Sequence, residues 1–218
     1  MNKPAAITTI AILVFACGCT MFSETRSEKK VPAEYNLTET GEQKIAVIIE
    51  NPIWADAPRI LTGQLTDEIH KKLKNDLKLA PKKIISQEKI SEYMRNTPQA
   101  EMQGPIEIGR SVGADLVLYA QIQNFKLTQT AETDYYRGLL DGKAALFDAE
   151  TGEKLWPLDE SGKTILVSYE IEQGNYEAAV GRLARAFAHC TTRYLYNCPV
   201  PRYKIYEDKS GMGWKDWE

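Results

Sequence analysis

The stretch VGADLVLYAQIQ, residues 112–123, decides the fold because a helix ends and a strand begins within it. The residues from Pro105 to Val112 have the pattern of a short helix, and Gly113 suits the left-handed conformation that commonly ends one. From Asp115 onward the side chains alternate between two faces, and near the start of this segment both faces are apolar. A strand covered on both faces lies inside a sheet that carries helices, so the stretch predicts a layered α/β arrangement.

The residues before this stretch alternate between strand and helix patterns. Lys44 to Glu50, KIAVIIE, is a short apolar and β-branched run that predicts a buried strand. A helix is predicted next, because apolar residues then recur at every fourth position: Leu61, Leu65, Ile69 and Leu73. A second brief strand is predicted at Lys83 to Ser86, and Ser86 can also cap a helix over Gln87 to Arg95.

After residue 123 the pattern changes to strands alone. Gly138 to Asp148 and Lys154 to Trp156 flank a turn, and Thr164 to Glu172 alternates between apolar and polar residues. Asn175 is a suitable N-cap for a last helix, whose apolar stripe reaches Tyr194. The order is β-α-β-α-α-β, then a meander, then α. We therefore expect an α/β (α+β) fold, with a single mixed β-sheet and helices mostly on one face.

The N-terminus has the composition of an export signal. Ala5 to Ala16 is almost wholly apolar and follows a weakly positive start at Lys3. A helix that spans a bilayer needs about 20 apolar residues, so this run matches the shorter apolar region of a signal peptide. The next stretch, Met21 to Glu42, is polar, charged and without periodicity, which predicts a tether.

The junction FACGCT, residues 15–20, resembles the lipobox of bacterial lipoproteins. In that class the cysteine at the cleavage site becomes the lipidated first residue of the mature chain. Cys19 is the expected lipidation site because the small Gly18 precedes it, and Cys17 is the alternative. The resemblance implies attachment of fatty acids such as palmitate, which together hold a protein on a membrane. It also implies a location in the cell envelope, on the outer membrane and facing the periplasm.

Four regions follow from these patterns. We expect a lipoprotein signal peptide at residues 1–18, a flexible polar tether at 19–43, an α/β globular domain at 44–197 and an aromatic tail at 198–218. The tail contains four aromatic residues that are candidate partner contacts: Tyr203, Tyr206, Trp214 and Trp217. A strap folded back over the domain would also account for these rings.

Two cysteines remain in the mature chain, Cys190 and Cys198. In an oxidising periplasm they can pair. A continuous helix would hold them about 12 Å apart, too far for a disulfide, so pairing requires the helix to end before Cys198. Pro199 makes that end feasible. The alternative is that both thiols stay reduced.

Three stretches resemble a group of periplasmic lipoprotein domains: IAVIIE at 45–50, IGRSVGADLVLYAQI at 108–122 and ALFDAETGEKLW at 145–156. The group includes the curli-secretion lipoprotein, the amino-terminal domain of the Tol-Pal propeller protein and a lipoprotein activator of penicillin-binding proteins. The resemblance covers residues 44–196. It implies the fold given above and a role in secretion, envelope assembly or cell-wall regulation.

The sequence offers little for catalysis or for cofactors. The net charge of −3 and the lack of a strong basic patch argue against nucleic acid. ESGKT at 160–164 looks like the end of a phosphate-binding loop, but Pro157 stands where that motif needs glycine, so we expect no nucleotide. The two histidines stand in no metal-ligand set and in no nucleophile–base pair. We therefore expect no metal, no cofactor and no catalytic residue.

The resulting hypothesis is a membrane-anchored periplasmic lipoprotein that is not an enzyme. It would bind an envelope protein partner or assemble with itself, with the N-terminal lipid as its contact to the membrane. An enzyme acting on an envelope substrate, or a lipoprotein that binds a small ligand, is the alternative.

Overall fold

The computed structural model describes residues 29–130, 135–159, 161–171 and 174–204. The predicted signal peptide and residues 19–28 of the predicted tether lie outside the described residues. None of the helices in the described part of the chain is long and apolar enough to cross a membrane.

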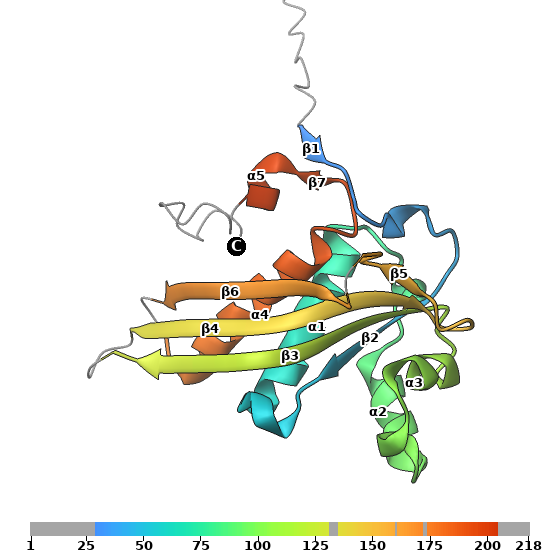
Figure 1. Ribbon diagram of the computed structural model, residues 1–218, viewed down its shortest axis with the longest axis horizontal. Helices are drawn as coiled ribbons and strands as arrows, with labels where there is room; N and C mark the ends of the chain where they lie inside the picture. Colours follow the sequence, from blue (N-terminus) through green and yellow to red (C-terminus); the bar gives the residue numbers. More distant parts are fainter. Residues whose placement is uncertain (1–28, 131–134, 160, 172–173, 205–218) are drawn as a thin grey trace, which may run out of the picture.

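One mixed sheet organises the domain (Figure 1). Strand β2 pairs in parallel with β3, β3 pairs antiparallel with β4, and both β5 and β6 pair antiparallel with β4. The strands are β2 (Ile45–Glu50), β3 (Leu116–Gln129), β4 (Tyr136–Asp148), β5 (Lys154–Trp156) and β6 (Lys163–Ile171). The sheet and its meander confirm the predicted fold class.

The two longest helices, α1 (Arg59–Asn75) and α4 (Tyr176–Thr192), cover one face of this sheet. All four residues of the predicted α1 stripe are fully buried, which confirms the apolar face read from the sequence. Strand β4 approaches α4 closely through two glycines. A Cβ atom on Gly138 would lie 2.8 Å from Leu183, and one on Gly142 would lie 2.9 Å from the Phe187 ring.

Helices α2 (Gln87–Asn96) and α3 (Pro105–Ser111) cover part of the opposite face, above β2 and the start of β3. Gly109 of α3 lies directly over the side chain of Val117. The predicted caps are present, since Ser86 accepts a hydrogen bond from the Lys89 amide and Gly113 is left-handed with φ 76°. A second, smaller apolar cluster forms here from Ala46, Ile85, Ile90, Ile108, Val112 and Ala114.

The brief strand predicted at Lys83 to Ser86 is reduced to one bridge between Ile84 and Ile45. A short 3₁₀ helix, η3 (Pro81–Lys83), occupies the start of this segment. Pro81 begins this turn and has no N–H group to donate to a neighbouring strand. Only the last residues of the predicted strand are therefore extended. The Ile85 amide then donates to the Ile45 carbonyl across 2.8 Å.

The structure also corrects the predicted boundary between tether and domain. Strand β1 (Lys30–Val31) pairs with β7 (Cys198–Pro199), which leads into α5 (Val200–Lys204). Leu37, in the 3₁₀ helix η1 (Leu37–Glu39), is buried in the main core. Glu34 accepts a hydrogen bond from Trp156 Nε1 at 2.7 Å and pairs with Lys163 at 2.8 Å. These long-range contacts fold residues 30–43 and 198–204 onto the domain, although their local composition is that of a linker.

Candidate docking surface

The connection between β2 and α1 exposes two large apolar side chains next to each other. This connection, residues 51–58, contains the 3₁₀ helix η2 (Ile53–Ala55) and is called the Ile53–Trp54 loop below. Ile53 is 100% exposed and Trp54 is 61% exposed. Single exposed apolar residues are ordinary, but adjacent aromatic and aliphatic residues on one loop are typical of protein interfaces.

The backbone holds this loop in one conformation. The Ala55 amide donates to the Pro52 carbonyl at 2.9 Å, and the Asn51 side chain donates to the Ala57 carbonyl at 3.2 Å. Asp56 adopts the left-handed conformation, φ 52°, that ends η2. Ala55 is buried in the main core and anchors the loop to the domain, while Ile53 and Trp54 point outward. A loop that is already ordered loses little conformational entropy when it binds.

The Ile53–Trp54 loop lies at the opposite end of the domain from the N-terminal strand β1 (Figure 1). Helix α1 separates the two ends, since the loop precedes it and Arg202 pairs with Asp76 at its C-terminal end. At 1.5 Å per residue, this 17-residue helix is about 25 Å long. The loop therefore lies away from the side on which the chain enters the domain.

A second surface lies on the part of the sheet that α2 and α3 leave uncovered. Tyr119 and Gln121 of β3 and Lys143 of β4 project from it, because Gln121 pairs with Lys143 in the register and alternate residues share a face. A hollow of about 310 Å³ opens between them. Burial and the hydrogen bond to Glu50 raise the pKa of Tyr119 above its ordinary value. Its phenol is therefore neutral at neutral pH.

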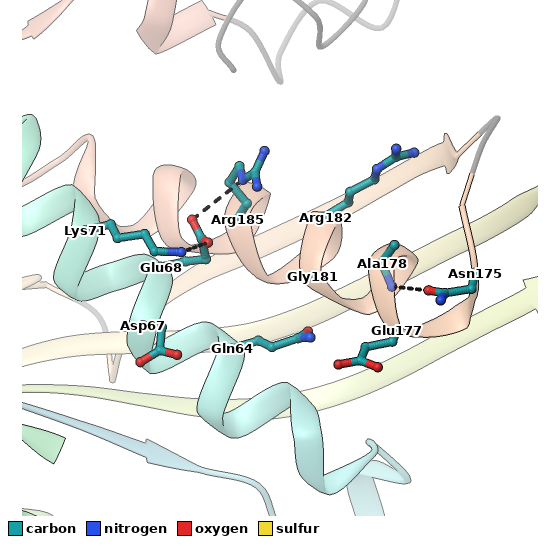
Figure 2. Close-up of a pocket in the computed structure, with 10 residues that line it drawn as sticks. All are labelled: Gln64, Asp67, Glu68, Lys71, Asn175, Glu177, Ala178, Gly181, Arg182 and Arg185. Carbon is teal, nitrogen blue, oxygen red and sulfur yellow. Dashed lines mark hydrogen bonds and ion pairs between the residues drawn. The ribbon is translucent and has the colours of Figure 1, made fainter. Parts of the chain in front are cut away.

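A second hollow, of about 580 Å³, lies between α1 and α4 and is shown in Figure 2. Glu68 bridges the two helices, with 2.7 Å to Lys71 and 3.6 Å to Arg185. Asn175 caps α4 by accepting a hydrogen bond from the Ala178 amide at 2.9 Å. The lining carries as many acidic as basic side chains, namely Asp67, Glu68, Glu177, Lys71, Arg182 and Arg185. The Glu68 side chain is 13% exposed, and its contact with Arg185 links α1 to α4.

Of the site residues predicted from the sequence, the structure describes Tyr203, Cys190 and Cys198. Tyr203 is half-buried, with its ring 5.9 Å from that of Tyr194 and over the guanidinium of Arg193, so part of the tail is packed against the domain. Tyr206, Trp214 and Trp217, like Cys17 and Cys19, lie outside the described residues.

Cys190 and Cys198 are buried free thiols, so the structure has the reduced alternative rather than the possible disulfide. Helix α4 ends at Thr192, as that pairing would require. The Cys198 thiol instead donates to the Tyr196 hydroxyl at 3.3 Å. Burial raises the pKa of the Cys198 thiol, which keeps it in the less reactive protonated form.

The described residues contain no group of three His, Cys, Asp or Glu side chains that could hold a metal ion. His189 is buried and its Nε2 lies 2.8 Å from the Arg202 carbonyl, which joins α4 to α5. Within the described chain this histidine is therefore a structural residue rather than a base facing a cleft.

The exposure of the Ile53–Trp54 loop was not predicted from the sequence. Its signal was present, because two large apolar residues stand between Pro52 and Pro58 in a segment with neither helical nor strand periodicity. The open sheet face was also not predicted, although polar residues stand at alternate positions of β3 from Tyr119 to Gln123.

The mixed sheet, its helical layers and the folded N-terminal arm define an α+β domain of the envelope-lipoprotein group that the sequence resembles. The family model of the peptidoglycan-synthase activator LpoB matches residues 31–161, more than half of the chain, and the chain belongs to this family. No curated protein sequence matches the chain.

Several solved structures are similar to the chain at low sequence identity. Lipoprotein GNA1162 from Neisseria meningitidis is 19% identical, with 66% of this chain and 94% of that chain covered and a TM-score of 0.39. The PelC dodecamer from Paraburkholderia phytofirmans is 14% identical, with 78% and 93% covered and a TM-score of 0.44. The LpoB C-terminal domain from Salmonella enterica is 17% identical, with 66% and 86% covered and a TM-score of 0.35.

Proposed function

We propose that this chain is a lipid-anchored envelope protein that binds a peptidoglycan synthase and activates it without catalysing a reaction itself. Membership of the peptidoglycan-synthase activator family supports the identity of the partner. The observation that carries the proposal is the ordered Ile53–Trp54 loop, which presents two exposed apolar side chains on the side away from β1.

The loop has the properties of an interface anchor. Burying a large apolar side chain contributes about 1.5–3 kcal/mol, and tryptophan is enriched among the residues that dominate binding energy. Ile60, in the first turn of α1, adds a further apolar side chain that is 40% exposed. A hydrophobic pocket on the synthase would remove these side chains from water.

The proposed geometry also suits a protein held on a membrane. With Cys19 lipidated, the ten residues 20–29 can span at most about 35 Å between the lipid and β1. The Ile53–Trp54 loop would then face the periplasm, where a synthase can reach it.

Replacing Trp54 by alanine tests the docking contact. We expect the variant to bind the host's purified peptidoglycan synthase about 30-fold more weakly, because loss of an interface anchor costs at least about 2 kcal/mol. Stimulation of glycan polymerisation should fall in parallel, and surface plasmon resonance with a polymerisation assay measures both. Met102→Ala is the matched control, because Met102 is 88% exposed in η4 (Ala100–Met102), remote from the loop in sequence. Equal binding by Trp54→Ala and the wild type, or no stimulation by the wild type, would overturn the proposal.

The lipid anchor has a separate test. In the native host, Cys19→Ser should abolish incorporation of labelled fatty acid, while Cys17→Ser should leave it intact, because Cys19 is the proposed lipidated residue. Labelling followed by electrophoresis measures this. The opposite result would assign the lipid to Cys17.

A further inference from the structure

The uncovered part of the sheet carries a cluster of hydrogen-bonding side chains around a small hollow. Gln121 and Gln123 lie on β3, Lys143 and Phe147 lie on β4, and Ser161 lies just before β6. In Figure 1 the strands β3, β4 and β6 pass in front of α1 and α4, so this face is the one turned away from the two long helices. We call these residues, together with Tyr119, the open-face site.

A hydrogen-bond network orients the two amides. Glu50 accepts hydrogen bonds from the Tyr119 hydroxyl and, at 3.1 Å, from Gln121 Nε2. The Gln121 side-chain oxygen in turn accepts a hydrogen bond from Gln123 Nε2. An amide has two N–H donors and an oxygen with two lone pairs, and these bonds use only some of those positions. The remaining donors and acceptors of both amides are available to a ligand in the hollow.

The other side chains add an aromatic ring and a positive charge. Phe147 is half-buried at one end of the hollow. It pairs with Val117 of β3, so Tyr119, two residues further along β3, lies between Phe147 and Gln121. Lys143 stands directly opposite Gln121, and its ammonium group lies 3.3 Å from the Ser161 hydroxyl. Fixed polar groups beside an aromatic surface suit a ligand with many hydrogen-bonding groups and an apolar face.

A sugar ring meets this description, since hydroxyl and N-acetyl groups lie around its edge and C–H groups form its faces. A hollow of about 310 Å³ accommodates a small part of a glycan strand. Lys143 adds attraction for a carboxylate, which the N-acetylmuramic acid of a glycan strand carries where the stem peptide has been removed. A protein surface is a poorer fit. Amide, hydroxyl and charged groups line the hollow, whereas the core of a protein–protein interface is apolar and depleted of charged residues.

We propose that the open-face site binds a glycan strand of peptidoglycan, with Gln121 and Gln123 hydrogen-bonding the sugars and Lys143 facing a carboxylate. The choice of peptidoglycan as the source of the sugar rests on the proposed function, whereas the sugar-binding chemistry rests on the site. The 3₁₀ helix η2 of the Ile53–Trp54 loop contacts β3, the strand that carries Tyr119 and the two glutamines of the site. An activator built this way would hold the synthase and its product together.

Binding to purified, protein-free peptidoglycan sacculi and to peptide-free glycan strands tests this proposal. Co-sedimentation with sacculi, and titration of the strands followed by NMR, should show binding by the wild type. The double variant Gln121→Ala/Gln123→Ala should bind at least tenfold more weakly, and Lys143→Gln should weaken binding to carboxylated strands more than to uncharged N-acetylglucosamine oligomers. Gln64→Ala is the matched control, because it removes an amide from the α1–α4 hollow instead.

The outcomes separate this proposal from the synthase contact. Trp54→Ala should keep glycan binding while losing the synthase, and the double glutamine variant should remain folded by circular dichroism. If the wild type binds no glycan, or the double variant binds as tightly as the wild type, the open-face proposal fails, while a persisting effect of Trp54→Ala leaves the proposed function standing. Binding of isolated stem peptides without any binding of peptide-free strands would also overturn it.

Discussion

Replacing Gly142 by alanine is expected to lower the free energy of unfolding by about 3 kcal/mol, at the upper end of the usual cost of overpacking a core. A Cβ atom at this position would lie 2.7 Å from the backbone oxygen of Gln121 and 2.9 Å from the Phe187 ring. The first contact is with the neighbouring strand, where Gly142 faces Ile122 in the register, so that strand would have to shift. The second contact would push α4 away from the sheet.

A second glycine, Gly63, provides a matched control for this prediction. Gly63 lies in α1, and a Cβ atom there would meet nothing within 4 Å. Gly63→Ala should therefore be neutral or raise the free energy of unfolding by up to about 1 kcal/mol, because alanine favours the helix. Urea denaturation followed by circular dichroism measures both variants. A loss below about 1 kcal/mol for Gly142→Ala would contradict the close packing of β4 on α4.

The same contact can be tested from the other side. Phe187→Leu removes the ring edge that a Cβ on Gly142 would meet, but it leaves the Gln121 carbonyl in place. The double variant should therefore be more stable than the sum of the two single losses predicts, because one of the two clashes is relieved. Strict additivity would indicate that the backbone contact accounts for the whole effect.

The free energy of unfolding is expected to fall by about 3 kcal/mol between pH 6.5 and pH 4 because of His189. Burial in the protein lowers the pKa of His189 from 6.5 to about 4. Between these values the unfolded chain binds a proton at this residue and the folded chain does not, so lowering the pH favours unfolding. The loss begins near the unfolded pKa of 6.5 and is complete near the folded pKa, at about 1.4 kcal/mol for each unit.

The groups around His189 are consistent with this direction. Lys72 of α1 and Arg193, which follows α4, oppose a positive charge on the ring. Asp76, which follows α1, and the Arg202 carbonyl of α5 favour it. Burial outweighs the favourable contacts. NMR titration of the imidazole should give a pKa well below 6.5 in the folded protein, and a value near 6.5 would refute the argument.

Substitutions separate His189 from the other titrating groups. His189→Gln keeps a donor for the Arg202 carbonyl and should remove most of the change between pH 6.5 and 4. His70 is also partly buried and its pKa is also lowered by burial, so His70→Gln serves as the comparison and should leave most of the change in place. If His70→Gln removes the larger share instead, the assignment to His189 is wrong.

Local patterns predicted the elements whose residues carry their own signal. The α1 stripe, the Ser86 and Asn175 caps and the left-handed Gly113 all appear in the structure where the sequence places them. Each depends on neighbours within about four residues, so burial periodicity and capping chemistry suffice to predict it. Strand β3 shows the limit, because it continues past the predicted end at Gln123 to Gln129, where pairing with β4 extends a mostly polar segment.

The sequence by itself determined the α+β class and the order of the main elements, because both follow from local composition and periodicity. The export signal and the lipidation site at the N-terminus stay predictions. The tertiary structure alone decided that residues 30–43 belong to the domain, that Ile53 and Trp54 are exposed, and that Gln121 and Lys143 lie side by side. These facts depend on contacts between residues far apart in the chain. A polar segment belongs to the folded domain when distant strands and side chains contact it. An apolar pair stays exposed when no distant element covers it.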